Sequence, residues 1–248
     1  MKLHTFGDSS KPAVILVHGV LTPWQIWEEA ICYFKADYYV LVPALDSHVE
    51  EYPSDFHSIG DEAYQIETYI KESLNGEVHA LIGLSMGGAI CWEIFRRNNC
   101  KIRHLILDGA PLAKMPGWIV RFVTEQYKNI IIKSQKREHG TLKKFSKVFL
   151  PERYLETYLK IADAMDETSI QNMIQSVGSE SVMNGGSKDT QIHYYYGTEI
   201  NEVYSAKSAR KVKKLYPEAK IKRFRGYSHG ELTLYHQKEL CDMIQVYF

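Results

Sequence analysis

The sequence predicts an α/β fold, with a mostly parallel central sheet, helices on both faces and a helical insertion. Short apolar runs rich in β-branched residues alternate along the chain with amphipathic segments of helical period. This alternation is typical of strand–helix–strand crossovers, which build parallel sheets covered on both faces. One long stretch between two of the apolar runs shows helical period only. A chain of 248 residues is long enough for one such domain with an insertion.

The predicted strands are apolar runs that end at glycine, proline or a polar turn residue. The run AVILVHG at 13–19 is β-branched and ends in glycine, as a buried strand does. One strand is expected before it. The remaining predicted strands cover residues 38–45, 78–84, 102–111, 191–197 and 219–226.

The predicted core helices repeat their apolar residues three or four positions apart. In residues 24–35 these positions are 27, 30, 31 and 34. Residues 61–76 follow the same rule and end at Gly76, a residue type that favours helix termination. The remaining core helices are predicted at 87–99, at 205–215 and in a last segment that ends near Phe248.

The alternation of predicted strands and helices stops between about Pro111 and about Asp189, where only helical periods occur. We therefore predict a core of residues 1–111 and 190–248 and a helical insertion of residues 112–189. Residues 178–189 are expected to form a flexible return linker. Most of the large apolar side chains of the insertion are expected to pack against the core, and a few to line a pocket: Trp118, Phe122, Tyr127, Phe149 and Tyr154.

Ser85 lies where a predicted strand meets a predicted helix with no loop between them. The segment GLSMG places Gly83 and Gly87 two residues away on either side. A direct strand-to-helix turn strains its central residue and brings the flanking residues almost into contact, so side chains there would clash. We interpret Ser85 as a nucleophile at the carboxyl end of the sheet, and the Met86 N–H as a donor to an oxyanion. The alternative is a glycine-rich turn whose serine only caps the helix.

The chain resembles the α/β-hydrolase superfamily over nearly its whole length. The matching motifs are VHGV (17–20), GLSMG (83–87), LDGAP (107–111), YYGTEINE (195–202) and GYSHGEL (226–232). The resemblance implies a serine, an acid and a histidine in that chain order, with the histidine in a loop after the last strand. His229 fits that position as the base, whereas nearby His236 falls inside the predicted last helix.

The resemblance implies further features around Ser85. The backbone N–H of Val20 would complete the oxyanion hole with that of Met86, and His18 would orient this loop. The helical insertion lies where the family places a cap over the nucleophile. After the strand at 38–45 many relatives carry D-x-x-G-H-G, but this chain has LDSHVEE, whose His48 is placed to line the site.

The acid departs from the family pattern. Relatives place an aspartate three residues after the glycine that ends the strand at 191–197, and this chain has Ile200 at that position. Glu202, just before a predicted helix, is the preferred candidate, and Glu199 is the second. Asp108, at the end of the preceding strand, is the third, although an Asp-Gly pair also serves as a turn.

These features predict a serine hydrolase of the carboxylesterase type, acting through an acyl-enzyme on a small to medium, partly apolar ester. The same fold also hosts C–C bond hydrolases, lyases, lipases and thioesterases, so those activities remain open. A third possibility is a non-catalytic protein that binds a small ligand in the same pocket, which the unusual acid position keeps open.

Composition argues against several other classes. The formal net charge is zero, which gives no reason to expect nucleic acid or an acidic membrane as a partner. The sequence has no apolar run of about 18 residues, so no membrane span is expected. The four cysteines lack metal or disulfide spacing, which fits reduced thiols in a cytoplasm. No metal and no organic cofactor are expected, and the sequence does not address the oligomeric state.

Overall fold

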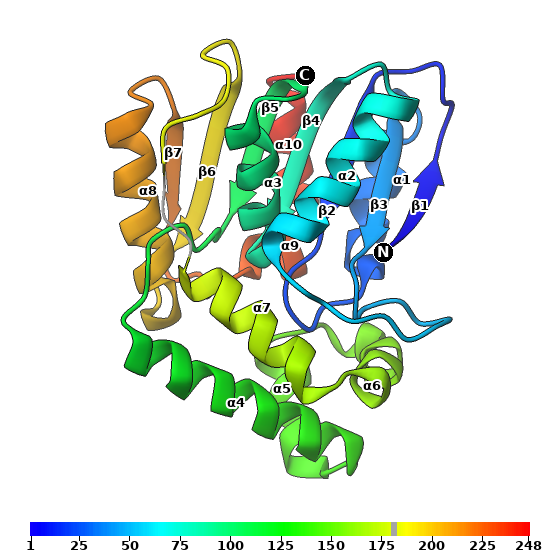
Figure 1. The fold of residues 1–248 in the computed structure, drawn as a ribbon, viewed down its shortest axis with the longest axis vertical. Coiled ribbons are helices and arrows are strands. Elements are labelled where there is room, and N and C mark those ends of the chain that lie inside the picture. The colour runs from blue at the N-terminus through cyan, green and yellow to red at the C-terminus, as the bar shows by residue number, and fades with distance from the viewer. Residues whose placement is uncertain (180–182) are drawn as a thin grey trace.

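A seven-stranded sheet forms the centre of the protein in the computed structural model, which describes residues 1–179 and 183–248, apart from the side chains at 147 and 148 (Figure 1). The strand order is β1-β3-β2-β4-β5-β6-β7; β1 runs antiparallel to β3, and every other pair is parallel. The strands are β1 (Lys2–Phe6), β2 (Ala13–Val17), β3 (Tyr39–Ala44), β4 (Glu77–Leu84), β5 (Lys101–Asp108), β6 (Gln191–Gly197) and β7 (Lys220–Phe224). The predicted α/β fold class is confirmed.

The strand register brings the ends of several strands to one edge of the sheet. In the β4–β5 pair Leu84 lies opposite Asp108, and in the β5–β6 pair Asp108 lies opposite Tyr195. All five residues of β2 are buried, as the unbroken apolar run predicted. Loops that leave these strands therefore begin side by side at the carboxyl edge.

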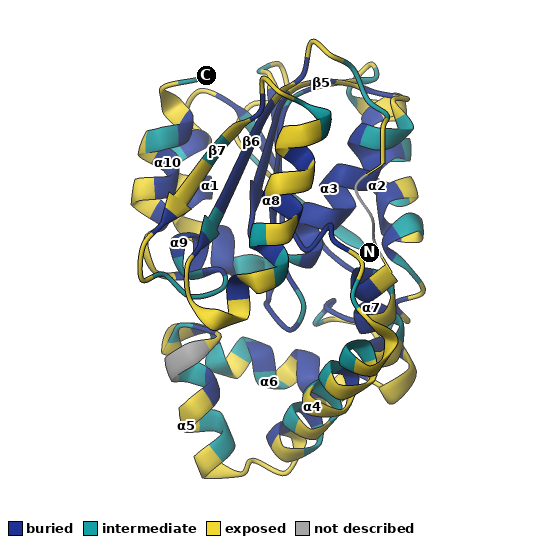
Figure 2. Cartoon of the chain, turned by 90° about the vertical axis from the view of Figure 1, so that its left-hand side faces the viewer, coloured by how far each residue is buried: buried dark blue, intermediate teal, exposed yellow. Residues whose placement is uncertain are grey.

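Helices cover both faces of the sheet. Figure 1 shows α2, α3 and α8 on one face and α1 and α10 on the other, and Figure 2 shows their buried sides turned toward the strands. The core helices are η1 (Trp24–Trp27), α1 (Glu28–Phe34), α2 (Ile59–Ser73), α3 (Met86–Arg97), η3 (Ile200–Glu202), α8 (Val203–Leu215), α9 (Glu231–Tyr235) and α10 (Gln237–Gln245). No helix among the described residues is long and apolar enough to cross a bilayer.

The last helix differs from the prediction. It is divided at His236, whose φ of −127° and ψ of 38° leave the helical region. The N–H of His236 bonds to Leu232, and its carbonyl accepts from Leu240, so the break costs little hydrogen bonding. Local hydrogen bonding thus permits a bend that the apolar period did not reveal.

Between β5 and β6 the chain forms a layer of helices over the carboxyl edge of the sheet (Figure 1). These insertion helices are α4 (Gly117–Gln135), α5 (His139–Val148), η2 (Glu152–Tyr154), α6 (Leu155–Ala164) and α7 (Glu167–Ser179). The sequence periods indicated α4, α6 and α7, but α5 was missed because only three of its ten residues are apolar: Leu142, Phe145 and Val148. Of the predicted linker 178–189, residues 180–182 lie outside the described part of the chain.

The large apolar residues of the insertion behave differently from one another. Trp118 and Phe122 are 67% and 61% exposed, so the expectation that most pack inward is wrong for these two. One turn of helix separates them, and they share the outer side of α4. Tyr154 is buried, and Tyr127 and Phe149 line a cavity next to Ser85.

Candidate active site

Ser85 occupies a strained turn between β4 and α3. Its φ of 52° and ψ of −117° place it outside the region that side chains usually adopt. A methyl group on Gly87 would lie 2.2 Å from the carbonyl oxygen of Val17, and one on Gly83 would lie 2.5 Å from the backbone of Gly87. Only glycine fits these two positions, so the predicted reason for the GLSMG spacing agrees with the local geometry.

His229 lies beside Ser85, in the loop between β7 and α9. Its Nε2 is 2.8 Å from the Ser85 hydroxyl oxygen, and its backbone N–H donates to the side chain of Asn201 at 3.2 Å. Gly109, with φ of +63°, allows this approach because a methyl there would lie 2.9 Å from the His229 ring. His236, the other histidine near in sequence, is paired with Glu231 at 3.6 Å on the surface.

Glu202 lies on the other side of the His229 ring. Its Oε2 is 3.4 Å from His229 Nδ1, and its Oε1 accepts from the Gly197 N–H at 3.3 Å. The side chain of Glu202 is only 1% exposed. Burial alone would raise the pKa of this carboxyl, but the contact with His229, together with Ser205 and the Gly197 N–H, outweighs burial and lowers the pKa. The resulting carboxylate faces the imidazole nitrogen that points away from Ser85.

The pKa of His229 moves the opposite way to that of Glu202. Burial alone would lower it, but the close carboxylate of Glu202, together with the charge of Asp108, outweighs burial, so the pKa is raised above its ordinary 6.5. An imidazole held between a hydroxyl and a buried carboxylate in this way can accept the serine proton and stay oriented as it does so.

The two other candidate acids are not paired with His229 in the part of the chain that the structure describes. Asp108 is buried, but its Oδ2 accepts from the hydroxyl of Thr233 at 2.6 Å and from the Thr233 N–H at 3.2 Å. Burial raises the pKa of Asp108 to about 6, although the Thr233 bonds oppose the rise. Glu199 is exposed, and Ile200, at the position where relatives carry aspartate, is 89% exposed.

Two backbone N–H groups next to Ser85 have no hydrogen-bond partner among the described residues. A methyl on Gly19 would lie 3.3 Å from Ser85 Cβ, so the loop from Gly19 to Thr22 lies against the serine. Its Gly19, Leu21 and Thr22 amides are hydrogen-bonded. Among the described residues, the N–H of Val20 and the N–H of Met86, the first residue of α3, have no partner.

Two buried histidines hold the loop from Gly19 to Thr22. His48 Nε2 accepts from the Leu21 N–H at 3.2 Å. His18 Nδ1 donates to the Gly19 carbonyl at 2.9 Å, and its Nε2 accepts from the Leu45 N–H at 3.1 Å. Burial lowers the pKa of both, to about 4 for His48, so both remain neutral acceptors. His48 therefore does not line the cavity, contrary to the expectation, but supports the loop from behind. The sequence offered no signal for the bond between Leu21 and His48, because it joins two loops that are distant along the chain.

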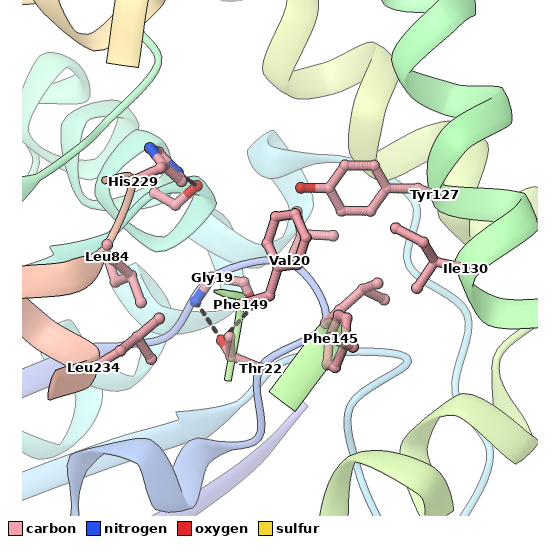
Figure 3. Close-up of a pocket in the computed structure, with 13 residues that line it drawn as sticks. Gly19, Val20, Thr22, Leu84, Tyr127, Ile130, Phe145, Phe149, His229 and Leu234 are labelled. Atoms are coloured by element: carbon pink, nitrogen blue, oxygen red, sulfur yellow. Dashed lines mark hydrogen bonds between the residues drawn. The ribbon is translucent and has the colours of Figure 1, made fainter. Parts of the chain in front are cut away.

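A cavity opens above Ser85, between the core and the insertion helices (Figure 3). Its walls are mainly apolar, and it leaves about 50 Å³ for the centres of water-sized groups. The insertion contributes Tyr127, Ile130, Phe145 and Phe149. The described residues contain no cluster of three or more His, Cys, Asp or Glu side chains that could hold a metal ion.

Known proteins share this architecture at low sequence identity. No protein-family model matches the chain, and no curated protein sequence does. An α/β hydrolase family protein from Desulfitobacterium hafniense has a TM-score of 0.73 at 19% identity, with 98% of each chain covered. A carboxylesterase structure from Nitrososphaera gargenis has a TM-score of 0.75 at 14% identity, covering 99% of this chain and 93% of that one. A thermophilic esterase from Thermogutta terrifontis has 0.72 at 13%, covering 99% and 92%.

The chain therefore has the α/β-hydrolase fold. The similar structures are covered almost from end to end, so the likeness includes the insertion as well as the sheet. This confirms, at the level of the fold, the resemblance that the sequence motifs indicated.

Proposed function

We propose that this protein is a serine hydrolase of the carboxylesterase type that cleaves a small ester through an acyl-enzyme on Ser85. The observation that carries the proposal is the line of groups from the Ser85 hydroxyl through His229 to Glu202, with contacts of 2.8 and 3.4 Å. A hydroxyl, a base and a buried carboxylate in this order are what an activated serine requires. The esterase titles of similar structures support the same chemistry.

In the proposed reaction His229 removes the proton of Ser85 as the hydroxyl attacks the ester carbonyl. The tetrahedral intermediate collapses when the protonated His229 gives that proton to the leaving alcohol. Water then attacks the acyl-enzyme, again with His229 as base, and releases the acid and free Ser85. Glu202 stabilises the imidazolium at each stage, because its carboxylate faces Nδ1 from a buried position.

The free N–H groups of Val20 and Met86 are proposed as the oxyanion hole. Each lies next to Ser85 and lacks a partner among the described residues. The Met86 N–H also lies at the start of α3, where the helix dipole favours negative charge. Donors fixed before the reaction stabilise the developing oxyanion without having to reorganise.

The helices α4–α7 are proposed to act as a cap, within an insertion of residues 112–189. They place apolar side chains above Ser85, where exclusion of water strengthens the electrostatic contacts of the site. The cavity is small, with about 50 Å³ for the centres of water-sized groups, so we expect esters with short acyl chains. The proposed acyl-enzyme chemistry requires neither a metal nor an organic cofactor.

A fluorophosphonate probe and short p-nitrophenyl esters test the proposal. The wild-type protein should be labelled and should hydrolyse the esters. The Ser85→Ala variant should lose labelling and lose turnover by on the order of 10⁴-fold or more. Ser9→Ala, in an exposed turn, is the matched control and should keep both. If folded wild-type protein is neither labelled nor active, the hydrolase proposal fails. The next hypothesis to test is then that the protein binds a small ligand without catalysis.

A further inference from the structure

Among the described residues, one hydroxyl in the cavity above Ser85 has neither a hydrogen-bond partner nor a role in the proposed reaction. Four of its lining side chains carry polar groups: Thr22, Ser85, Tyr127 and His229. Ser85 and His229 form a hydrogen bond with each other. The Thr22 hydroxyl accepts from the Gly19 N–H at 3.0 Å and donates to the Gly19 carbonyl at 2.9 Å, so it serves its own loop.

Tyr127 differs from these three. It projects from α4, and Figure 3 shows its hydroxyl pointing across the cavity toward the side where Val20 and His229 lie. Among the described residues its oxygen has no hydrogen-bond partner. Burial raises the pKa of Tyr127, so it stays a neutral hydroxyl that can donate.

The other side chains that the insertion contributes to the cavity are apolar: Ile130, Phe145 and Phe149. In the free protein, water can satisfy the Tyr127 hydroxyl. A substrate that fills the cavity displaces that water, so the hydroxyl then bonds to the substrate or is left unpaired. A site with such a group selects against substrates that cannot pair with it.

We propose that the Tyr127 hydroxyl donates a hydrogen bond to an oxygen of the substrate other than the scissile carbonyl. The preferred substrate is then a short ester with an ether or carbonyl oxygen a few bonds from the reacting carbon. This inference rests on the proposed function for its chemistry, but the selectivity belongs to Tyr127 and not to Ser85 or His229.

Two pairs of esters of equal size test the inference. On the acyl side, p-nitrophenyl 3-methoxypropanoate is compared with p-nitrophenyl pentanoate. On the alcohol side, 2-methoxyethyl butanoate is compared with butyl butanoate. Within each pair one oxygen replaces one methylene, so the ratio of the two kcat/KM values isolates the effect of that oxygen.

Tyr127→Phe should lower the ether-to-alkyl ratio by about 2- to 10-fold in one of the two pairs, which is what one neutral hydrogen bond provides. The pair that responds identifies the side of the ester that Tyr127 contacts. Tyr64→Phe, 63% exposed on α2, is the matched control and should leave both ratios unchanged. Equal ratios in wild type and Tyr127→Phe for both pairs would overturn the inference.

Binding separates this inference from the proposed function. In the Ser85→Ala background the esters are not consumed, so their dissociation constants can be measured by calorimetry with and without Tyr127→Phe. Loss of the ether preference in binding supports the role of Tyr127 even if wild-type turnover is absent. If Tyr127→Phe weakens ether and alkyl esters by the same factor, Tyr127 acts only through packing and the inference fails.

Discussion

The two walls of the cavity are built in different ways. On the core side the polar side chains have defined neighbours: His229 lies between Ser85 and Glu202, and Thr22 bonds to Gly19. On the insertion side the wall is apolar apart from the hydroxyl of Tyr127. Reaction geometry tolerates little displacement, whereas apolar contacts tolerate substitution. The core wall is thus suited to fix the chemistry, and the insertion wall to fix which substrate reaches it.

The largest effect is expected on the core side, from the buried carboxyl of Glu202. Glu202→Gln should lower kcat by about 10³-fold, because an amide cannot stabilise the imidazolium of His229 as a carboxylate does. Burial lowers the pKa of His229, and the carboxylate of Glu202 is the main group that raises it above 6.5. Because the base acts when neutral, the rate falls as pH drops through that pKa, and Glu202→Gln should shift this acid limb to lower pH. The pH profile of kcat/KM measures both effects.

Asp108→Asn is the matched control for Glu202→Gln. Asp108 is also buried, but it bonds to Thr233 rather than to His229, and an asparagine oxygen can still accept those bonds. Its loss of activity should stay within about 10-fold, since it acts on His229 through charge alone. A greater loss in Asp108→Asn than in Glu202→Gln would transfer the proposed acid role to Asp108.

A second comparison concerns two glycines, one in the core and one in the insertion. Gly87→Ala should destabilise the fold by about 3 kcal/mol or more, because its methyl would lie within 2.4 Å of the carbonyl oxygens of Val17 and His18. Gly140, in insertion helix α5, has no atom within 4 Å of an added methyl. Gly140→Ala should therefore stabilise the protein by about 0.5–1 kcal/mol, since alanine favours a helix. Denaturant unfolding of both variants measures the contrast, and a tolerated Gly87→Ala would contradict the tight turn.

The sequence predicted the parts of the molecule that local rules determine. Buried parallel strands appear as apolar runs, and the turn at Ser85 shows its geometry through Gly83 and Gly87. The resemblance to the α/β-hydrolase superfamily then indicated His229, because that family places its histidine in a loop after the last strand. The strands and the turn at Ser85 need only neighbouring residues, whereas His229 also needs the family resemblance.

Features that depend on contacts between distant segments were harder to predict. Glu199 and Glu202 are three residues apart, and only the short helix η3 turns one toward solvent and buries the other against His229. The bond from Leu21 to His48 joins two loops, so no local pattern contains it. Tyr127 was counted among the apolar residues of a helix, because sequence alone does not show that its hydroxyl faces a cavity.

The smallest effect is expected on the insertion wall, where Phe149 lines the cavity and is itself 38% exposed. Phe149→Ala should leave the groups around Ser85 in place and lengthen the space for the acyl chain. The optimum among p-nitrophenyl esters should therefore move to longer acyl chains. Each added methylene that gains burial is worth about 0.8 kcal/mol, so kcat/KM should rise by about 4-fold for each such carbon. Phe122→Ala, on the outer side of α4 and 61% exposed, is the matched control and should keep the wild-type chain-length profile. If the two variants gave the same profile, the insertion would cover the site without selecting the substrate, and the division of labour between the two walls would not hold.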